Sequence, residues 1–250
     1  MAATDAISFE LVSPERLERS VDVELVTVPG AEGYFGVLAR HAPLISALRP
    51  GVIDVCHTGR EADERYFVAS GFAEVTGGRC TVLAEHPEKV DDLDRAEVEK
   101  ALENARVDHN DARDEKERAD AARRIEVNDA RLRANRTAIL RTFFDMGGGM
   151  IDSSPMYGTS EAVVGHGLNE LGHPGGLISA TKVWTRFGGE ARGQMADSRD
   201  LWGVETFDVM QVHNLVSWRE HLKTLRAAKE QGRIRYIGVT TSHGRRHDEL

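Results

Sequence analysis

Polar and apolar residues alternate in short runs over the first part of the chain, up to about residue 86. The clearest runs are Ser8–Val12 and Asp22–Val28, and turn residues such as Pro29-Gly30 and Gly77-Gly78 separate such runs. Alternation with period two is typical of strands that bury one face, and turn signals at this spacing favour antiparallel pairing. The pattern predicts a β-sandwich or barrel, with further strands at Val52–Val55, Tyr66–Val68, Ala73–Thr76 and Arg79–Ala84.

After Pro87 the pattern becomes helical, and no Pro or Gly occurs before Gly147. Apolar residues recur at intervals of three and four in two stretches, 93–105 and 119–132. Asp92 or Asp94 can cap the first helix, and the polar stretch Asp108–Asp111 favours a turn between the two. The apolar stripes are narrow and rich in alanine, so we expect an antiparallel two-helix hairpin that is weakly docked and able to move.

A third pattern begins near residue 137. An apolar-faced helix is expected over Thr137–Asp145, followed by a repeating unit of a buried strand, a polar residue at its C-terminal end and a helix. The unit is about thirty residues long, the size of a βαβ motif. It predicts a partial (β/α) TIM-type barrel of about four strand–helix units, with strand ends at Met150–Asp152, Ile178–Lys182, Val209–His213 and Ile237–Thr240. The predicted domains are therefore 1–87, 88–136 and 137–250.

Composition narrows the classes of function. The chain has 250 residues, of which 40% are hydrophobic and 29% charged, as expected for globular domains. Its net charge of −9 argues against nonspecific binding to nucleic acid, which requires a basic face. The cysteines Cys56 and Cys80 lie in strand-like runs and are expected to be buried thiols in a reducing compartment.

The N-terminal half resembles the epsilon subunit of F-type ATP synthases. The resemblance is carried by Phe9–Glu15, Pro29–Gly51, Gly71–Val75 and Thr81–Glu85, and it extends collinearly from about residue 7 to 135. It implies a non-catalytic subunit that couples proton flow to ATP synthesis and restrains ATP hydrolysis. Its sandwich would bind the gamma subunit and the c-ring, and its hairpin would reach the catalytic alpha and beta subunits. The implied location is peripheral, on the cytoplasmic face of a bacterial plasma membrane, without a cofactor for this part.

Within Pro29–Gly51, the resemblance makes Glu32, Tyr34 and His41 candidates for contact with the c-ring. The alternative for each residue is that it only shapes a loop. Arg40 stands where the family usually has glycine, so we expect no positive φ angle at this position.

Some epsilon subunits bind ATP through an Asp-x-x-Arg pattern at the start of the first helix, and Asp92–Arg95 has this spacing. The second arginine expected further along is missing, and Leu102 stands near its place. A capped helix start with a salt bridge explains the same residues.

Four residues of the third region make chemical sense together. Tyr157 could donate a proton to a carbonyl oxygen, because the ammonium of Lys182 would lower the pKa of its phenol. Asp152 would hold this ammonium, and His213 could orient the carbonyl. These residues, with the stretches Asp152–Glu161 and Gly232–Val239, resemble the aldo-keto reductases. Taken singly, Asp152 or Lys182 would be an ordinary salt-bridge residue at a barrel end. The resemblance implies NADPH-dependent reduction of aldehydes or ketones as the alternative function.

The resemblance to this second family is incomplete over residues 137–250. The family's opening strand and its last three strand–helix units have no counterpart, and those units carry most contacts to the NADPH phosphates. A half barrel also leaves exposed sheet edges and an unfilled interior. We therefore expect a fusion that carries the four catalytic residues without a competent reductase, unless two copies complement one another.

Overall fold

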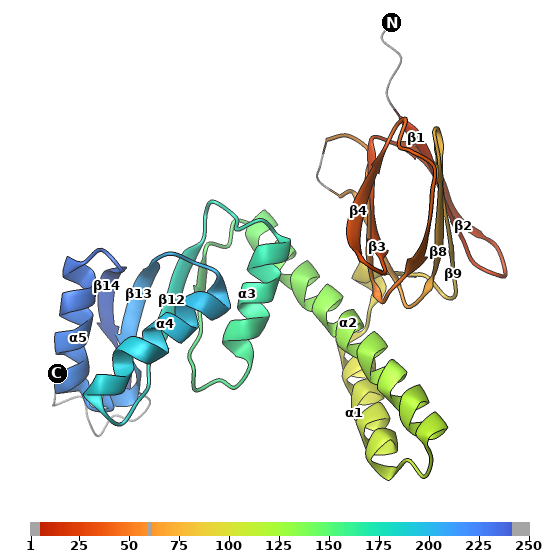
Figure 1. The fold of residues 1–250 in the computed structure, drawn as a ribbon. Coiled ribbons are helices and arrows are strands. Elements are labelled where there is room, and N and C mark those ends of the chain that lie inside the picture. Colours follow the sequence, from red (N-terminus) through yellow and green to blue (C-terminus); the bar gives the residue numbers. More distant parts are fainter. Residues whose placement is uncertain (1–5, 60–61, 242–250) are drawn as a thin grey trace, which may run out of the picture. The chain divides into compact units, whose positions relative to one another are not determined.

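The computed structural model describes residues 6–59 and 62–241. The chain divides into two compact units, residues 1–138 and 139–250. The first contains a β body and a helical hairpin, and the second contains a sheet with helices (Figure 1). The finer domain limits expected at residues 87 and 136 stay predictions.

The β body of the first unit is a two-layered sandwich, as predicted (Figure 1). Its strands follow the order β10-β7-β6-β3-β5-β8-β9-β1-β2, and β4 pairs with β3. The pairs are antiparallel except β1–β9, which is parallel. The strands are β1 (Ile7–Val12), β2 (Leu17–Val23), β3 (Leu25–Gly30), β4 (Gly33–Leu38), β5 (Leu44–Leu48), β6 (Gly51–Cys56), β7 (Glu64–Val68), β8 (Gly71–Thr76), β9 (Arg79–Ala84) and β10 (Glu88–Lys89).

The alternation seen in the sequence places one face of each strand in the sandwich core. In β1, Ile7, Phe9 and Leu11 are fully buried, and the residues between them are partly exposed. One expectation was wrong, because the run Asp22–Val28 is not a single strand. The chain bends at Glu24, so the run is divided between β2 and β3.

A polar cluster around Glu64 joins strands that lie near opposite ends of the sheet order. The Glu64 carboxylate on β7 accepts hydrogen bonds from the Arg19 guanidinium on β2, with Nε at 3.0 and 3.1 Å from its two oxygens. It also accepts one from the Tyr66 hydroxyl at 2.7 Å, and His57 Nε2 lies 3.1 Å away. Partial burial raises the pKa of Glu64, but the hydrogen bonds from Arg19, Tyr66 and His57 outweigh it and lower the pKa to about 2.

This cluster predicts how the stability of the sandwich depends on acid. A carboxylate with a depressed folded-state pKa adds stability that is present above its unfolded pKa, about 4.3, and is lost as the pH falls toward about 2. Glu64→Gln should therefore lower the melting temperature at neutral pH and flatten its fall between these two pH values. Calorimetry from pH 2 to pH 7, with exposed Glu74→Gln as control, measures the effect, and equal acid dependence of the variant and the unaltered chain would contradict it.

The hairpin consists of α1 (Arg95–Asp111) and α2 (Glu115–Asp145), preceded by the 3-10 turn Val90–Asp92. Asp94 caps α1, because its carboxylate accepts hydrogen bonds from the amides of Ala96 and Glu97 at 2.8 and 3.1 Å. Among the described helices, none combines the length and the apolar character needed to cross a bilayer.

Two expectations about the helices were wrong. The turn is not at Asp108–Asp111, which belongs to α1, but at residues 112–114, where the Asp114 side chain accepts a hydrogen bond from the Glu117 amide at 2.8 Å. A separate helix over Thr137–Asp145 does not exist either, since α2 runs through this stretch. No Gly or Pro lies between residues 113 and 146 to stop it.

The hairpin packs on the sandwich through a small apolar contact. Ala130 and Ala134 of α2 lie against Phe67, Val90 and Leu93. Arg131 of α2 pairs with Glu88 and lies over the Phe67 ring, 5.6 Å from its centroid. Asn135 Nδ2 of α2 also donates to the Leu93 carbonyl at 3.1 Å. Since the alanines of α2 bury little area, the apolar part of this contact is small.

The second unit is a four-stranded parallel sheet in the order β11-β12-β13-β14. The strands are β11 (Met150–Asp152), β12 (Ile178–Val183), β13 (Phe207–Val212) and β14 (Ile234–Val239), and the helices between them are α3 (Ser160–Glu170), α4 (Ala191–Trp202) and α5 (Trp218–Glu230). The four predicted strands are thus present with three helices between them, and they form an open parallel sheet among the described residues.

The two faces of this sheet differ. Residues such as Val183, Met210 and Val212 join α3, α4 and α5 in one apolar core. The opposite face carries Lys182 beside Gln211 in the strand register, and toward the N-terminal strand ends it carries Met150, Ile178 and Tyr236, which are 51%, 46% and 60% exposed. The helices therefore cover one face, and the predicted site residues lie on the other.

Candidate functional site

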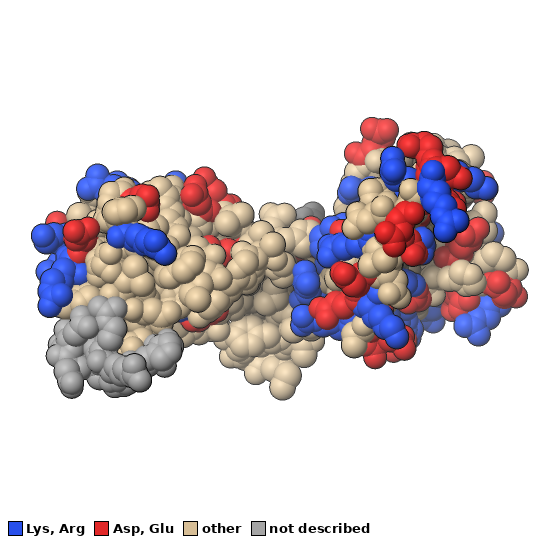
Figure 2. Space-filling view, turned by 90° about the horizontal axis from the view of Figure 1, so that it is seen from below, with Lys and Arg blue, Asp and Glu red and all other residues tan. Residues whose placement is uncertain are grey.

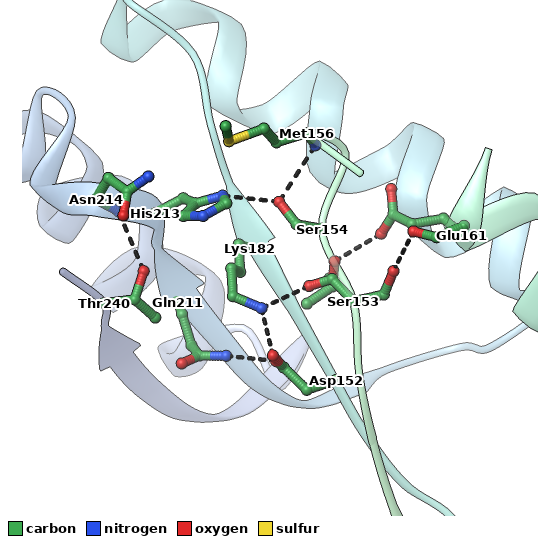
Figure 3. A network of polar contacts seen from close by, with 12 residues as sticks. Asp152, Ser153, Ser154, Met156, Glu161, Lys182, Gln211, His213, Asn214 and Thr240 are labelled. Atoms are coloured by element: carbon green, nitrogen blue, oxygen red, sulfur yellow. Dashed lines mark hydrogen bonds and ion pairs between the residues drawn. The ribbon is translucent and has the colours of Figure 1, made fainter. Parts of the chain in front are cut away.

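Three of the four predicted catalytic residues lie at the C-terminal ends of neighbouring parallel strands. Asp152 ends β11, Lys182 is next to last in β12, and His213 directly follows β13. Because the strands are parallel and in register, their C-terminal ends bring these side chains to one edge of the sheet (Figure 3).

Lys182 is almost fully buried, and its charge is fully partnered. Its Nζ donates to the Asp152 carboxylate at 2.5 Å and to the Ser153 carbonyl at 2.8 Å. The Asp152 side chain is 43% exposed and accepts a further hydrogen bond from Gln211 Nε2 at 2.8 Å. A buried ammonium needs such partners, and the Asp152 carboxylate is one of them.

Tyr157 lies in the turn after β11, beside both Lys182 and His213. Lys182 Nζ is 5.3 Å from the centroid of the Tyr157 ring, and the His213 ring meets it edge-on at 5.6 Å. Half of the Tyr157 side chain is exposed. The structure therefore brings all four predicted residues together, with the ammonium over the ring, and no hydrogen bond joins it to the hydroxyl among the described residues.

His213 is held in a defined orientation. Its Nδ1 lies 2.8 Å from Ser154 Oγ, which also accepts a hydrogen bond from the Met156 amide at 3.2 Å (Figure 3). This arrangement lets the Ser154 hydroxyl donate to Nδ1, which leaves the ring proton on Nε2. Burial, and then the nearby Lys182 ammonium, lower the pKa of His213 against the opposing effect of Asp152. A neutral imidazole with a proton on Nε2 can donate to a carbonyl oxygen.

Glu161 is a supporting residue that the sequence did not single out for a role. Its carboxylate is 97% buried and accepts hydrogen bonds from Thr181 Oγ1 at 2.6 Å, Ser198 Oγ at 3.1 Å and Trp202 Nε1 at 3.1 Å. Thr181 directly precedes Lys182, so Glu161 fixes β12 to α3 and α4 next to the ammonium. A carboxylate near the start of an apolar-faced helix was the only sequence signal.

Among the described residues, the C-terminal strand ends do not offer the charges that a pyridine dinucleotide needs. Lys182 is taken up by Asp152 and Ser153, and Arg186 is the one other Lys or Arg side chain in the described loops that directly follow β11, β12, β13 and β14. A diphosphate needs several cationic or amide donors. We therefore derive no reaction step through NADPH.

The predicted contact residues of the sandwich fall into two places. Glu32 lies in the turn before β4 and Tyr34 lies on β4, where its hydroxyl accepts a hydrogen bond from the Val52 amide at 3.2 Å. His41 follows β4, and its Nδ1 lies 2.8 Å from the Ala42 carbonyl oxygen. Six strand residues span about 20 Å, so β4 separates His41 from the other two. Their roles in contacts stay predictions.

Two smaller expectations have clear outcomes. Arg40 adopts φ = 65°, so the expectation of a negative φ at this position was wrong; its amide donates to the Gly77 carbonyl at 2.9 Å, and this bond supports the bend. At the start of α1, Asp94 is engaged as a cap and Arg95 pairs with Glu99 at 2.9 Å. The capped helix start thus accounts for Arg95, whereas Asp92, the aspartate of the ATP pattern, lies in the preceding 3-10 turn, and nucleotide binding by this pattern stays a prediction.

Comparisons with known proteins identify both halves of the chain. Residues 6–90 match the family model of the ATP synthase delta/epsilon chain β-sandwich domain. The ATP synthase epsilon chain of Rhodospirillum centenum is 48% identical over 132 residues, which are 51% of this chain and 90% of that protein. The chain belongs to the ATP synthase epsilon chain family. The epsilon chain of Rhodospirillum rubrum is 46% identical over 132 residues, 53% of this chain and 98% of that one.

The second half of this epsilon-family chain matches the aldo/keto reductase family model over residues 127–249. A solved putative 2,5-diketo-D-gluconic acid reductase B aligns with 25% identity and a TM-score of 0.38, covering 43% of this chain and 40% of that one. The chain thus spans less than half the length of this relative. It joins an epsilon-type N-terminal half to a segment of the aldo/keto reductase family.

The electrostatics of the four-residue cluster give a testable prediction about the pKa of His213. Because burial and the Lys182 ammonium lower the pKa of His213, its imidazole should titrate below the usual value of about 6.5. Lys182→Met should raise this pKa, since it removes a repelling charge and leaves Asp152 unpaired nearby. NMR titration of the His213 ring protons measures this pKa in the unaltered chain and in Lys182→Met. Exposed Lys223→Met is the control. An unchanged His213 titration in Lys182→Met would contradict the role of the ammonium.

Proposed function

We propose that this protein binds the gamma subunit and the c-ring of an F-type proton-translocating ATP synthase through its sandwich. The observation that carries the proposal is a row of exposed apolar side chains on the outer face of the sheet. Such a row is unusual on a protein without a partner, because contiguous apolar surface costs solvation free energy.

The strand register builds this apolar row. Phe72 of β8 pairs with Leu83 of β9, and Leu83 pairs with Val12 of β1, which in turn pairs with Leu17 of β2. Phe72, Leu83 and Leu17 are 58%, 51% and 56% exposed. Paired residues point to the same side of a sheet, so together they form one stripe, and Ile45 of β5, 72% exposed, extends it. A groove of about 510 Å³ lies along the stripe at Phe72 and Leu83.

The c-ring contact is assigned to the turn that carries Glu32 and Tyr34. Both side chains are exposed, and Tyr34 is braced by the Arg49 guanidinium, 5.3 Å from its ring centroid. A braced aromatic ring beside a carboxylate is a suitable contact for a partner, because little side-chain entropy is lost on binding. His41 lies at the other end of β4 and would contact a different partner surface.

The hairpin is assigned to the alpha and beta subunits, where it would restrain ATP hydrolysis. The support is its shallow contact with the sandwich, which depends on Ala130, Ala134 and the Arg131–Glu88 pair. Weak docking leaves the hairpin free to exchange one partner for another. On the visible face of the first unit, acidic and basic side chains are interleaved without a region of one sign (Figure 2). This distribution favours protein partners over nucleic acid. As part of the same proposal, the chain would lie on the cytoplasmic face of a bacterial membrane.

The apolar stripe can be tested in an epsilon-depleted ATP synthase. Phe72→Asp should weaken binding of the chain at least tenfold, since burying one such ring is worth roughly 1.5–3 kcal/mol. The unaltered chain should lower the rate of ATP hydrolysis, and the variant should do so only at higher concentration. Leu201→Asp, which changes an exposed apolar residue of α4 in the second unit, is the control for nonspecific effects. Equal binding of Phe72→Asp and the unaltered chain would refute the stripe as the docking surface.

Carbonyl reduction is the second candidate function, and the cluster of Tyr157, Lys182, Asp152 and His213 is the observation that favours it. In this arrangement Tyr157 is the proton donor, Lys182 stabilises the developing phenolate, and His213 Nε2 orients the carbonyl oxygen. NADPH would supply the hydride, and residues outside the described part of the protein would have to hold its phosphates.

We expect no oxidation of NADPH by this chain with a reactive aldehyde above the rate of the Tyr157→Phe variant. The reason is the lack of several diphosphate donors at the described strand ends. Following NADPH absorbance for both proteins provides the measurement. Aldehyde-dependent turnover that disappears in Tyr157→Phe would overturn the expectation and establish the reductase.

A further inference from the structure

A groove between α4 and α5 lies away from the four-residue cluster. Its floor includes Phe207 and Ile234, the first residues of β13 and β14, whereas the cluster occupies the other ends of the strands. It also lies on the face of the sheet that the helices cover. The groove has a volume of about 70 Å³, which holds several water-sized positions.

The groove exists because small residues face one another across the helix seam. Ala196 of α4 and Ala227 and Ala228 of α5 line it, and their small side chains leave space above the apolar floor. That floor consists of Phe207, Met210 and Ile234, each no more than 2% exposed. Larger side chains at the alanine positions would close the seam, as is usual in a packed core.

Three arginines surround this apolar floor. Arg192 and Arg199 lie on α4 and Arg233 precedes β14, and no Asp or Glu lines the groove. Within the described residues Arg192 and Arg233 have no ion-pair partner, and the Arg199 guanidinium reaches only Asp200, at 4.0 Å. The groove is therefore apolar at its base and positively charged at its rim.

We propose that this groove binds a small organic monocarboxylate with a short apolar body. Guanidinium groups bind carboxylates with two parallel hydrogen bonds, and the body of the ligand would displace water from Phe207 and Met210. The volume limits the apolar part to about the size of one ring or a short chain. The inference is independent of the proposed function, because it uses neither the sandwich nor the four-residue cluster.

Calorimetric titration of the full chain with benzoate tests the proposal. Benzoate should bind with one site per chain, and benzamide, which has the same shape without the charge, should bind at least tenfold more weakly. Arg192→Gln and Arg233→Gln should each weaken benzoate binding about three- to tenfold, which corresponds to one charge-assisted hydrogen bond. Arg226→Gln changes an exposed arginine of α5 that does not line the groove and should leave the affinity unchanged.

A second variant tests the shape of the site without removing charge. Ala227→Leu should fill the groove and abolish benzoate binding while the circular dichroism spectrum stays unchanged. Inorganic phosphate should not compete with benzoate. The proposal is overturned if benzoate shows no saturable binding, if benzamide or phosphate binds as well as benzoate does, or if Ala227→Leu and the arginine variants bind like the unaltered chain.

Discussion

Every strand in this protein must place alternate side chains on opposite faces, and the structure depends on which face becomes buried. In the sandwich, Ile7, Phe9 and Leu11 enter the core, so the alternate positions of β1 remain at the surface. In the second unit the helices bury Val183, Met210 and Val212, so Lys182 and Gln211 are left on the opposite face. Both candidate sites are formed by the faces that the core does not use. The apolar stripe with Phe72 and the cluster around Lys182 therefore have the same geometric origin.

The two sites differ in how their polar groups are satisfied. In the sandwich, the polar cluster at Glu64 joins distant strands with hydrogen bonds from Arg19 and Tyr66. The second unit instead buries an ammonium and a carboxylate close together, at Lys182 and Glu161, and each is surrounded by partners. Buried charges without such partners would destabilise the fold. These networks therefore both hold the second unit together and fix its candidate site.

The chain joins two families through one uninterrupted helix. Residues 6–90 and 127–249 match the ATP synthase delta/epsilon and aldo/keto reductase models, and α2 extends from Glu115 to Asp145 across the boundary between the two compact units. The middle of α2 supplies Ala130 and Ala134 to the sandwich contact, and its last turn supplies Phe144 to the core of the second unit. One helix thus contributes to two hydrophobic cores, which is why a change of family leaves no break in secondary structure.

The sequence by itself predicted the sandwich, the hairpin and the parallel strands with helices between them, because period-two and period-3.6 patterns are local properties. It also pointed to Asp152, Lys182 and His213, because polar residues at strand ends can be read locally. The sequence did not predict the turn at residues 112–114 or the continuation of α2 through Thr137. At both places the local signals for helix and for turn differ by little free energy. Only the tertiary structure decided that β4 separates His41 from Tyr34, that Glu161 supports Lys182, and that Arg40 adopts a positive φ angle. Each of these depends on contacts between residues far apart in the chain, which no local pattern records.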